Sequence, residues 1–195
     1  MEYRLAPEHK YPAANEDCLA AYRWLIKSGI SAKDIVIGGD SAGGSLTLMT
    51  LLSLRDTGDT LPAAAFMLSL WGDLINFDGE SYKTRAEMDF MNSLESSQIC
   101  SDMFIGTLPT KPLILSPIWE NLEGIPNLLI QVGDHEILLS DSTRLSERAK
   151  EAGVDVKLEV WDNMWHVFQL FAPYVPEANQ AINNIGKFVK NNFGN

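Results

Sequence analysis

IVIGGDSAGGSLTL, residues 35–48, is the stretch of the chain that decides the fold. Its β-branched beginning, 35–37, predicts a buried strand. The run from Leu46 to Leu54 is apolar nearly all round, which is typical of a buried helix. Between them, Gly39-Asp40-Ser41-Ala42-Gly43 fits the pattern G-x-S-x-G, so the sequence predicts a sharp strand-turn-helix connection with Ser41 at its apex.

Ser41 stands in the setting of a nucleophile elbow. A sharp turn of this kind lifts the serine hydroxyl clear of the sheet, and Gly39 and Gly43 leave room for it because they carry no Cβ. Two other readings fit less well. A phosphate-binding loop needs lysine where Ser45 stands, and a trypsin-like serine needs an all-β chain with histidine and aspartate upstream. We therefore interpret Ser41 as a candidate nucleophile.

Strand-like and helix-like segments alternate along the rest of the chain, without an internal repeat. This alternation predicts an α/β fold with a mostly parallel sheet flanked by helices, in a single domain over 1–195. The expected strands cover 35–37, 65–70, 128–132 and, with the half-polar pattern of a sheet edge, 156–160, besides one near Tyr3. The expected helices run from the N-cap Asn15 to Gly29, over 46–54, around Leu145 and from Pro176.

Residues 71–126 form a long polar excursion between two expected strands. A connection of this length is uncommon in a compact domain, so we expect it to act as a cap and to help wall a binding site. Phe77, Tyr82 and Met88 lie in this excursion. We expect them to pack within the cap in preference to lining an acyl pocket.

His166 is the best-placed candidate for a general base. The chain has 3 histidines, of which His9 precedes the elbow and His135 lies at a strand end. A parallel-sheet hydrolase needs serine, then an acid, then histidine along the chain. His166 satisfies that order, and as general base it would take the Ser41 proton.

The acid would follow the strand 128–132, where Asp134 and Glu136 are both candidates. The pattern alone leaves the two open. The pair His135-Glu136 does not begin a zinc-binding H-E-x-x-H helix, because Leu139 stands where the second histidine would be. We therefore expect no catalytic metal and no cofactor.

Composition narrows the range of partners. The formal net charge of −11 argues against nucleic acid, whose phosphates are bound by clustered lysine and arginine. No apolar run reaches the roughly 18 residues of a membrane span. The first residues show no basic region followed by an apolar core, and there are only 2 cysteines. We expect a cytoplasmic protein that acts on a small molecule.

Four motifs are found in one chain: Tyr3-Arg4-Leu5-Ala6-Pro7-Glu8, Gly39-Asp40-Ser41-Ala42-Gly43-Gly44, Trp71-Gly72-Asp73-Leu74, and Gln131-Val132-Gly133 leading into Glu136-Ile137-Leu138-Leu139. With them the chain resembles the hormone-sensitive-lipase-like, or family IV, bacterial esterases of the α/β-hydrolase fold. The resemblance implies Glu136 as the acid, since Leu138 and Asp141 follow at the family's spacing. It also implies short acyl esters or lactones as substrates, and a homodimer paired through Val156 to Val160.

One motif of that family is missing from the sequence. Its members carry a His-Gly-Gly-Gly loop before the Tyr-Arg-Leu-Ala-Pro-Glu motif, and the loop supplies backbone N–H groups to the oxyanion hole. Without that loop, we expect the backbone N–H of Ala42 to be the hydrogen-bond donor of the oxyanion hole. We expect the chain to be N-terminally truncated, to lack the first strands and the N-terminal cap, and to have an unpaired inner sheet edge.

The sequence thus predicts a serine carboxylic ester hydrolase that works through a Ser-His-acid triad and an acyl-enzyme intermediate, with activity weakened by the missing loop. Amidase and thioesterase activity share the same requirements. The alternative is a truncated inactive pseudoenzyme, or a small-molecule-binding protein of the same fold. The plant gibberellin receptors resemble this family but have lost the histidine that His166 supplies here.

Overall fold

The computed structural model describes residues 1–194 and is built on a four-stranded parallel sheet with the order β1-β2-β3-β4. Every neighbouring pair is parallel, which confirms the predicted sheet. β4 lies at one edge, as its half-polar pattern predicted, and β1 lies at the other. The strands are β1 (Val36–Asp40), β2 (Ala64–Leu68), β3 (Asn127–Gly133) and β4 (Val156–Trp161).

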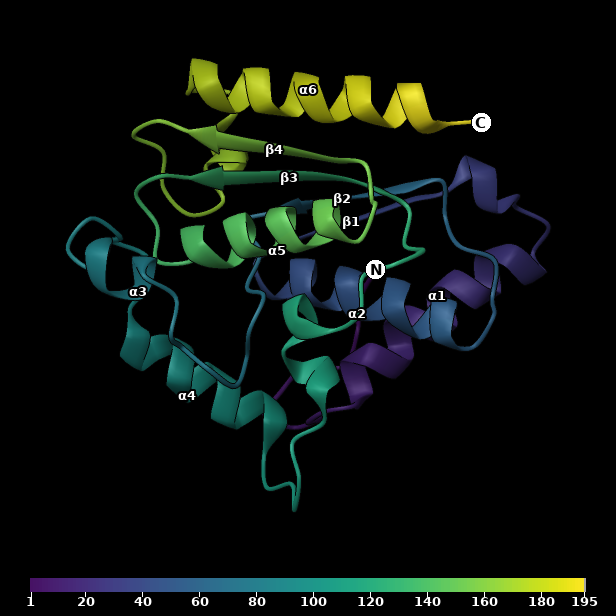
Figure 1. Cartoon of the computed structure of the whole chain (residues 1–195), viewed down its shortest axis with the longest axis horizontal. Coiled ribbons are helices and arrows are strands. Elements are labelled where there is room, and N and C mark those ends of the chain that lie inside the picture. Colours follow the sequence, from purple (N-terminus) through teal and green to yellow (C-terminus); the bar gives the residue numbers. More distant parts are fainter. Residues whose placement is uncertain (195) are drawn as a thin grey trace.

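Helices cover both faces of the sheet (Figure 1). α6 (Pro176–Asn192) lies on one face, while α1 (Ala13–Lys27), α2 (Ala42–Asp56) and α5 (Leu139–Glu151) lie on the other. The main core joins the inner faces of α2 and α5 to the sheet through Leu48, Leu51, Met67, Ile130 and Leu145, all fully buried. Within residues 1–194, none of the helices is both long and apolar enough to cross a membrane.

The predicted start of α1 and the predicted strand near Tyr3 were wrong. α1 begins at Ala13 after Pro12, and Asn15 does not cap it: its side-chain amide donates to Met49 Sδ at 2.8 Å. Tyr3 lies in no strand, and the neighbouring Arg4 binds the carboxylate of Asp17 through its backbone N–H at 2.9 Å and its guanidinium at 2.8 Å.

β2 ends at Leu68, two residues earlier than expected. The cause is Ser69, whose φ of 48° turns the chain out of the extended conformation. Ser69 is fully buried at this turn.

The carboxyl ends of β3 and β4 point to the same side of the molecule, where α3 also lies (Figure 1).

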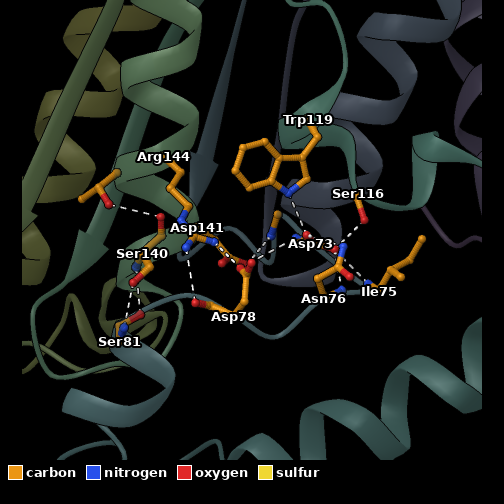
Figure 2. A network of polar contacts seen from close by, with 12 residues as sticks. Asp73, Ile75, Asn76, Asp78, Ser81, Ser116, Trp119, Ser140, Asp141 and Arg144 are labelled. Carbon is orange, nitrogen blue, oxygen red and sulfur yellow. Dashed lines mark hydrogen bonds and ion pairs between the residues drawn. The ribbon is translucent and has the colours of Figure 1, made fainter.

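The excursion 71–126 is folded onto α5 by buried polar groups (Figure 2). Asp141 of α5 accepts the backbone N–H of Gly72 at 2.8 Å and that of Asp73 at 3.3 Å. Asp73 in turn accepts the indole N–H of Trp119 at 2.8 Å. The excursion contains α3 (Ser81–Thr84), α4 (Leu94–Ile105) and the 3₁₀ turns η2 (Leu113–Leu115) and η3 (Pro117–Trp119); the other 3₁₀ turns are η1 (Ala32–Asp34) and η4 (Phe168–Phe171).

Two of the three large side chains expected to pack inside the excursion do so. The Phe77 ring lies 6.3 Å from that of Trp71 and 5.8 Å from that of Tyr82, measured between ring centroids. Tyr82 is almost fully buried, whereas Met88 is 40% exposed. The Phe77 and Tyr82 rings therefore help to close the excursion over α5.

Candidate active site

Ser41 occupies the strained turn between β1 and α2. Its φ is 52° and its ψ −118°, values that serine adopts rarely. Its backbone N–H donates to the Leu68 carbonyl at 2.9 Å, and its own carbonyl accepts from the Trp71 N–H at 3.2 Å. The backbone of Ser41 therefore has the conformation of the predicted elbow, and its N–H and carbonyl are both hydrogen-bonded to the segment at the end of β2.

The two glycines of the elbow have different roles. A Cβ at Gly39 would overlap the backbone of Gly43, so only glycine lets the helix start this close to the strand. A Cβ at Gly43 would come no closer than 4.0 Å to the Asp40 carboxylate, an ordinary contact. Gly39 is thus the crowded position, and the expectation that Gly43 needs the same room was wrong.

Ala42 is the first residue of α2 and is exposed. The first backbone N–H groups of a helix have no acceptor within the helix, and the helix dipole places positive charge there. The Ala42 N–H is therefore suitable for binding an oxygen that carries negative charge beside Ser41.

Glu136 and His166 form a buried pair. The His166 Nδ1 atom lies 3.0 Å from the Glu136 Oε2 atom. Glu136 has no exposed surface and His166 is 6% exposed. The other carboxylate oxygen, Oε1, accepts the backbone N–H of Gly133 at 2.7 Å and the Ser69 hydroxyl at 2.9 Å. These donors compensate the buried carboxylate for the loss of water.

Asp134, the alternative acid, lies away from this pair. Its Oδ1 atom accepts the Asn163 backbone N–H at 2.6 Å and lies 3.7 Å from His135 Nε2. Its side chain is 31% exposed. The geometry joins the imidazole of His166 to Glu136, and the carboxylate of Asp134 instead holds the loop after β4.

That loop reaches Glu136 by passing close over the end of β3. A Cβ at Gly133 would overlap the backbone of Met164, so a larger residue would push the loop away. The His135 backbone N–H donates to the Met164 carbonyl at 3.0 Å. Glycine at the end of β3 therefore allows the loop to carry His166 to the acid.

Ser41 and the Glu136–His166 pair both form hydrogen bonds with the short segment after β2, residues 69–71. The Ser41 carbonyl accepts from Trp71, and the Ser69 hydroxyl accepts from Val167, the residue after His166. Within residues 1–194, no hydrogen bond joins the Ser41 hydroxyl to the imidazole. Proton transfer between them stays a prediction.

Two cavities adjoin the elbow. One, of about 650 Å³, runs along the free edge of β1 and is lined by Ser41 and Ala42 together with residues of α1 and α2. The other, of about 230 Å³, is lined mainly by apolar side chains beside Ala42, among them Leu46, Met49, Trp71 and Phe104. An apolar pocket next to the elbow could receive an acyl chain.

Sequence reasoning missed two residues at this site. Ser69 is the one polar residue in the otherwise apolar run 65–70, and it lies near the carboxyl end of the expected strand, where parallel sheets bring functional groups together. Asp89 of the excursion accepts the backbone N–H of Ile137, next to Glu136, at 2.9 Å. Its signal was weaker, because Asp89 lies in the polar excursion and not at the end of an expected strand, and its contact joins residues 48 positions apart.

Comparison with known proteins places the chain among hydrolases. The alpha/beta hydrolase fold family matches residues 1–170. An acetyl-hydrolase of Streptomyces hygroscopicus is 39% identical over 191 residues, which are 97% of this chain and 63% of the relative. An esterase of Acinetobacter venetianus is 37% identical over 190 residues, 96% of this chain and 62% of the relative.

Solved structures give the same result. The crystal structure of an esterase from the bacterial hormone-sensitive lipase family is 47% identical, with a TM-score of 0.95, over 99% of this chain and 65% of that one. The esterase EstE5, in a crystal soaked by p-nitrophenyl butyrate, is 44% identical, with a TM-score of 0.93, over 98% and 64%.

The chain spans less than two thirds of the length of each of these relatives. The match nevertheless includes the elbow, the sheet and the Glu136–His166 pair, since the family covers residues 1–170. The chain therefore belongs to the alpha/beta hydrolase fold family and, within it, is similar to the esterases of the hormone-sensitive lipase family.

Proposed function

We propose that the chain carries the catalytic residues of a serine carboxylesterase. The chief support is the buried hydrogen bond between His166 Nδ1 and Glu136 Oε2, in a fold that also holds Ser41 at a strained elbow. A histidine bound in this way through Nδ1 keeps Nε2 for proton transfer. Glu136 orients the imidazole and stabilises its charged form.

The reaction would proceed in two steps. Ser41 Oγ attacks the ester carbonyl carbon while His166 takes its proton, and His166 then gives that proton to the departing alcohol. Water, deprotonated by the same imidazole, then attacks the acyl carbon; the bond to Ser41 Oγ breaks, His166 returns the proton to Oγ, and the acid is released. The Ala42 N–H donates to the oxygen that becomes negative in both steps.

The substrates we propose are esters with short to medium acyl chains, or lactones. The apolar cavity beside Ala42 has a volume of about 230 Å³. At roughly 30 Å³ for a water-sized group, it holds about seven or eight non-hydrogen atoms. EstE5, soaked by p-nitrophenyl butyrate, is a relative treated with such an ester.

The test is hydrolysis of p-nitrophenyl esters of increasing acyl length, together with labelling by a fluorophosphonate, which reacts with activated serines. We expect turnover of these esters to depend on the Ala42 N–H, because removal of an oxyanion donor costs about 10² to 10³ in rate. Ser41→Ala should remove labelling and lower turnover by at least about 10³-fold. Decanoate esters should react more slowly than butyrate.

Ser142→Ala is the matched control. Ser142 is a fully buried serine of α5 whose hydroxyl has no hydrogen-bond partner among the described residues. It should leave labelling and turnover unchanged. Equal labelling of the parent protein and Ser41→Ala would contradict the esterase assignment and favour the inactive pseudoenzyme or binding protein.

A further inference from the structure

Ser69 is a buried serine that connects the proposed acid to the loop of the proposed base. It has no exposed surface. Its hydroxyl donates to Glu136 Oε1 at 2.9 Å and accepts the backbone N–H of Val167 at 2.9 Å. Its own backbone N–H is held by the Gln131 carbonyl at 2.7 Å. The hydroxyl therefore donates and accepts at once, which alanine, glycine or valine cannot do.

The backbone around this hydroxyl is strained. Ser41, Ser69 and Val167 have φ values of 52°, 48° and 50°. A β-branched residue such as Val167 rarely adopts this conformation, and it persists only where the surrounding structure holds it. The Ser69 hydroxyl binds the N–H of Val167 and so supplies one such contact directly beside His166.

The other donor to the acid cannot replace Ser69. The Gly133 N–H also binds Glu136 Oε1, at 2.7 Å, but it makes no contact with the Val167 N–H. Without the hydroxyl, that N–H would lose its hydrogen-bond partner in a site where Ser69 has no exposed surface and Val167 is 4% exposed.

We propose that Ser69 is a positioning residue of the hydrolysis: one hydroxyl fixes both the Glu136 carboxylate and the backbone beside His166, and so keeps the Nδ1–Oε2 hydrogen bond aligned. The inference rests on the proposed function of Ser41, Glu136 and His166. Ser69 itself touches no reacting atom.

The experiment compares Ser69→Ala, Ser69→Gly and the control Ser142→Ala, each checked for folding by circular dichroism and thermal melting. Ser69→Ala removes the hydroxyl and keeps the Cβ, while Ser69→Gly removes both and accepts a φ of 48° without strain. We expect both to lower kcat for p-nitrophenyl butyrate and the fluorophosphonate labelling rate by about 10- to 100-fold. KM should stay the same, and Ser142→Ala should match the parent protein.

Either of two results would overturn the proposal. One is a folded Ser69→Ala protein that is as active as the control. The other is full activity in Ser69→Gly, which would mean that backbone strain, and not the hydroxyl, matters at this position. If Ser69→Ala fails to fold, Ser69→Gly decides alone.

A second readout is independent of esterase activity. The proton between His166 Nδ1 and Glu136 Oε2 should give a low-field ¹H NMR resonance, assigned by its absence in His166→Ala. We expect Ser69→Ala and Ser69→Gly to weaken or abolish it and Ser142→Ala to keep it. An unchanged resonance would refute the role of Ser69, whereas absent labelling of the parent protein would refute the proposed function alone.

Discussion

At the scale of single residues, the carboxylate of Glu136 is the most constrained group of the candidate site. It is fully buried and binds the Gly133 N–H, the Ser69 hydroxyl and the imidazole of His166. A buried carboxylate with these partners can stabilise an imidazolium, because little water screens the interaction. Asp134, two residues earlier in the chain, instead accepts the backbone N–H of Asn163 at 2.6 Å.

Glu136→Gln and Asp134→Asn test this difference with isosteric changes. Glu136→Gln removes the charge and one acceptor beside His166, so we expect kcat and the fluorophosphonate labelling rate to fall by about 10³- to 10⁴-fold. Asp134→Asn should keep most activity, because its oxygen can still accept the Asn163 N–H. Measuring both variants by labelling decides the acid, and the opposite ranking would assign it to Asp134.

The sequence left these two acids open for a physical reason. Asp134 and Glu136 both follow β3, and spacing cannot tell which side chain the loop around His166 will reach. The choice depends on the close passage of Met164 over Gly133, a contact between residues far apart in the chain. The family resemblance implied Glu136, and the position of His166 agrees with it.

At the scale of elements, helices with a local apolar pattern were predicted, whereas a helix held by contacts between residues far apart in the chain was not. α2, α5 and α6 were predicted from local apolar patterns, since each buries one or more faces in the core. The short α3 was not predicted, because it is held by long-range bonds such as Ser140 Oγ accepting the Ser81 N–H at 2.7 Å (Figure 2). The Asp73 and Asp141 contacts are of the same kind.

Because the Asp141 carboxyl is buried, we expect the free energy of unfolding to depend on pH. Burial raises its pKa from 3.8 to about 7, although the N–H groups of Gly72 and Asp73 act in the opposite direction. The folded protein therefore keeps this proton up to about pH 7, whereas the unfolded chain releases it near pH 3.8. This group makes the free energy of unfolding fall as the pH rises between the two values.

Asp141→Asn should remove that contribution, because the amide is neutral at every pH and its oxygen can still accept the Gly72 N–H. Thermal melting at pH 5 and pH 8 measures it. Between pH 5 and pH 8, the free energy of unfolding of the variant should rise relative to that of the parent protein by on the order of 2 to 4 kcal/mol. Parallel pH curves for the two proteins would contradict an elevated pKa.

At the scale of the whole molecule, the parallel sheet and its edge at β4 were predictable, but a strand near Tyr3 was predicted and is absent. Alternating strands and helices favour a parallel sheet whatever the details of the loops. The expected strand near Tyr3 did not form, and Arg4 instead binds Asp17 on α1. β1 and β4 lie at the two edges of the sheet.

The two edges present different surfaces to another chain. β1 borders the cavity of about 650 Å³ and contains Gly38 and Gly39. On β4, Lys157 pairs with Glu159 at 2.6 Å, and Val160 is 42% exposed. A lysine on an edge strand usually opposes pairing, but its charge is partly offset here by Glu159.

We propose that the chain forms a homodimer through β4, as the family resemblance implies. The two edges can be tested with one kind of substitution. Val160→Lys adds an uncompensated charge to β4, while Val36→Lys adds it to β1. Sedimentation velocity should show the dimer weakened at least about tenfold in Val160→Lys, because pairing would bury the new ammonium group. Val36→Lys should leave the dimer intact.

Two other outcomes would contradict this proposal. If Val36→Lys alone dissociates the dimer, two copies pair through β1 and not through β4. If the parent protein stays monomeric at all concentrations, neither edge forms a dimer.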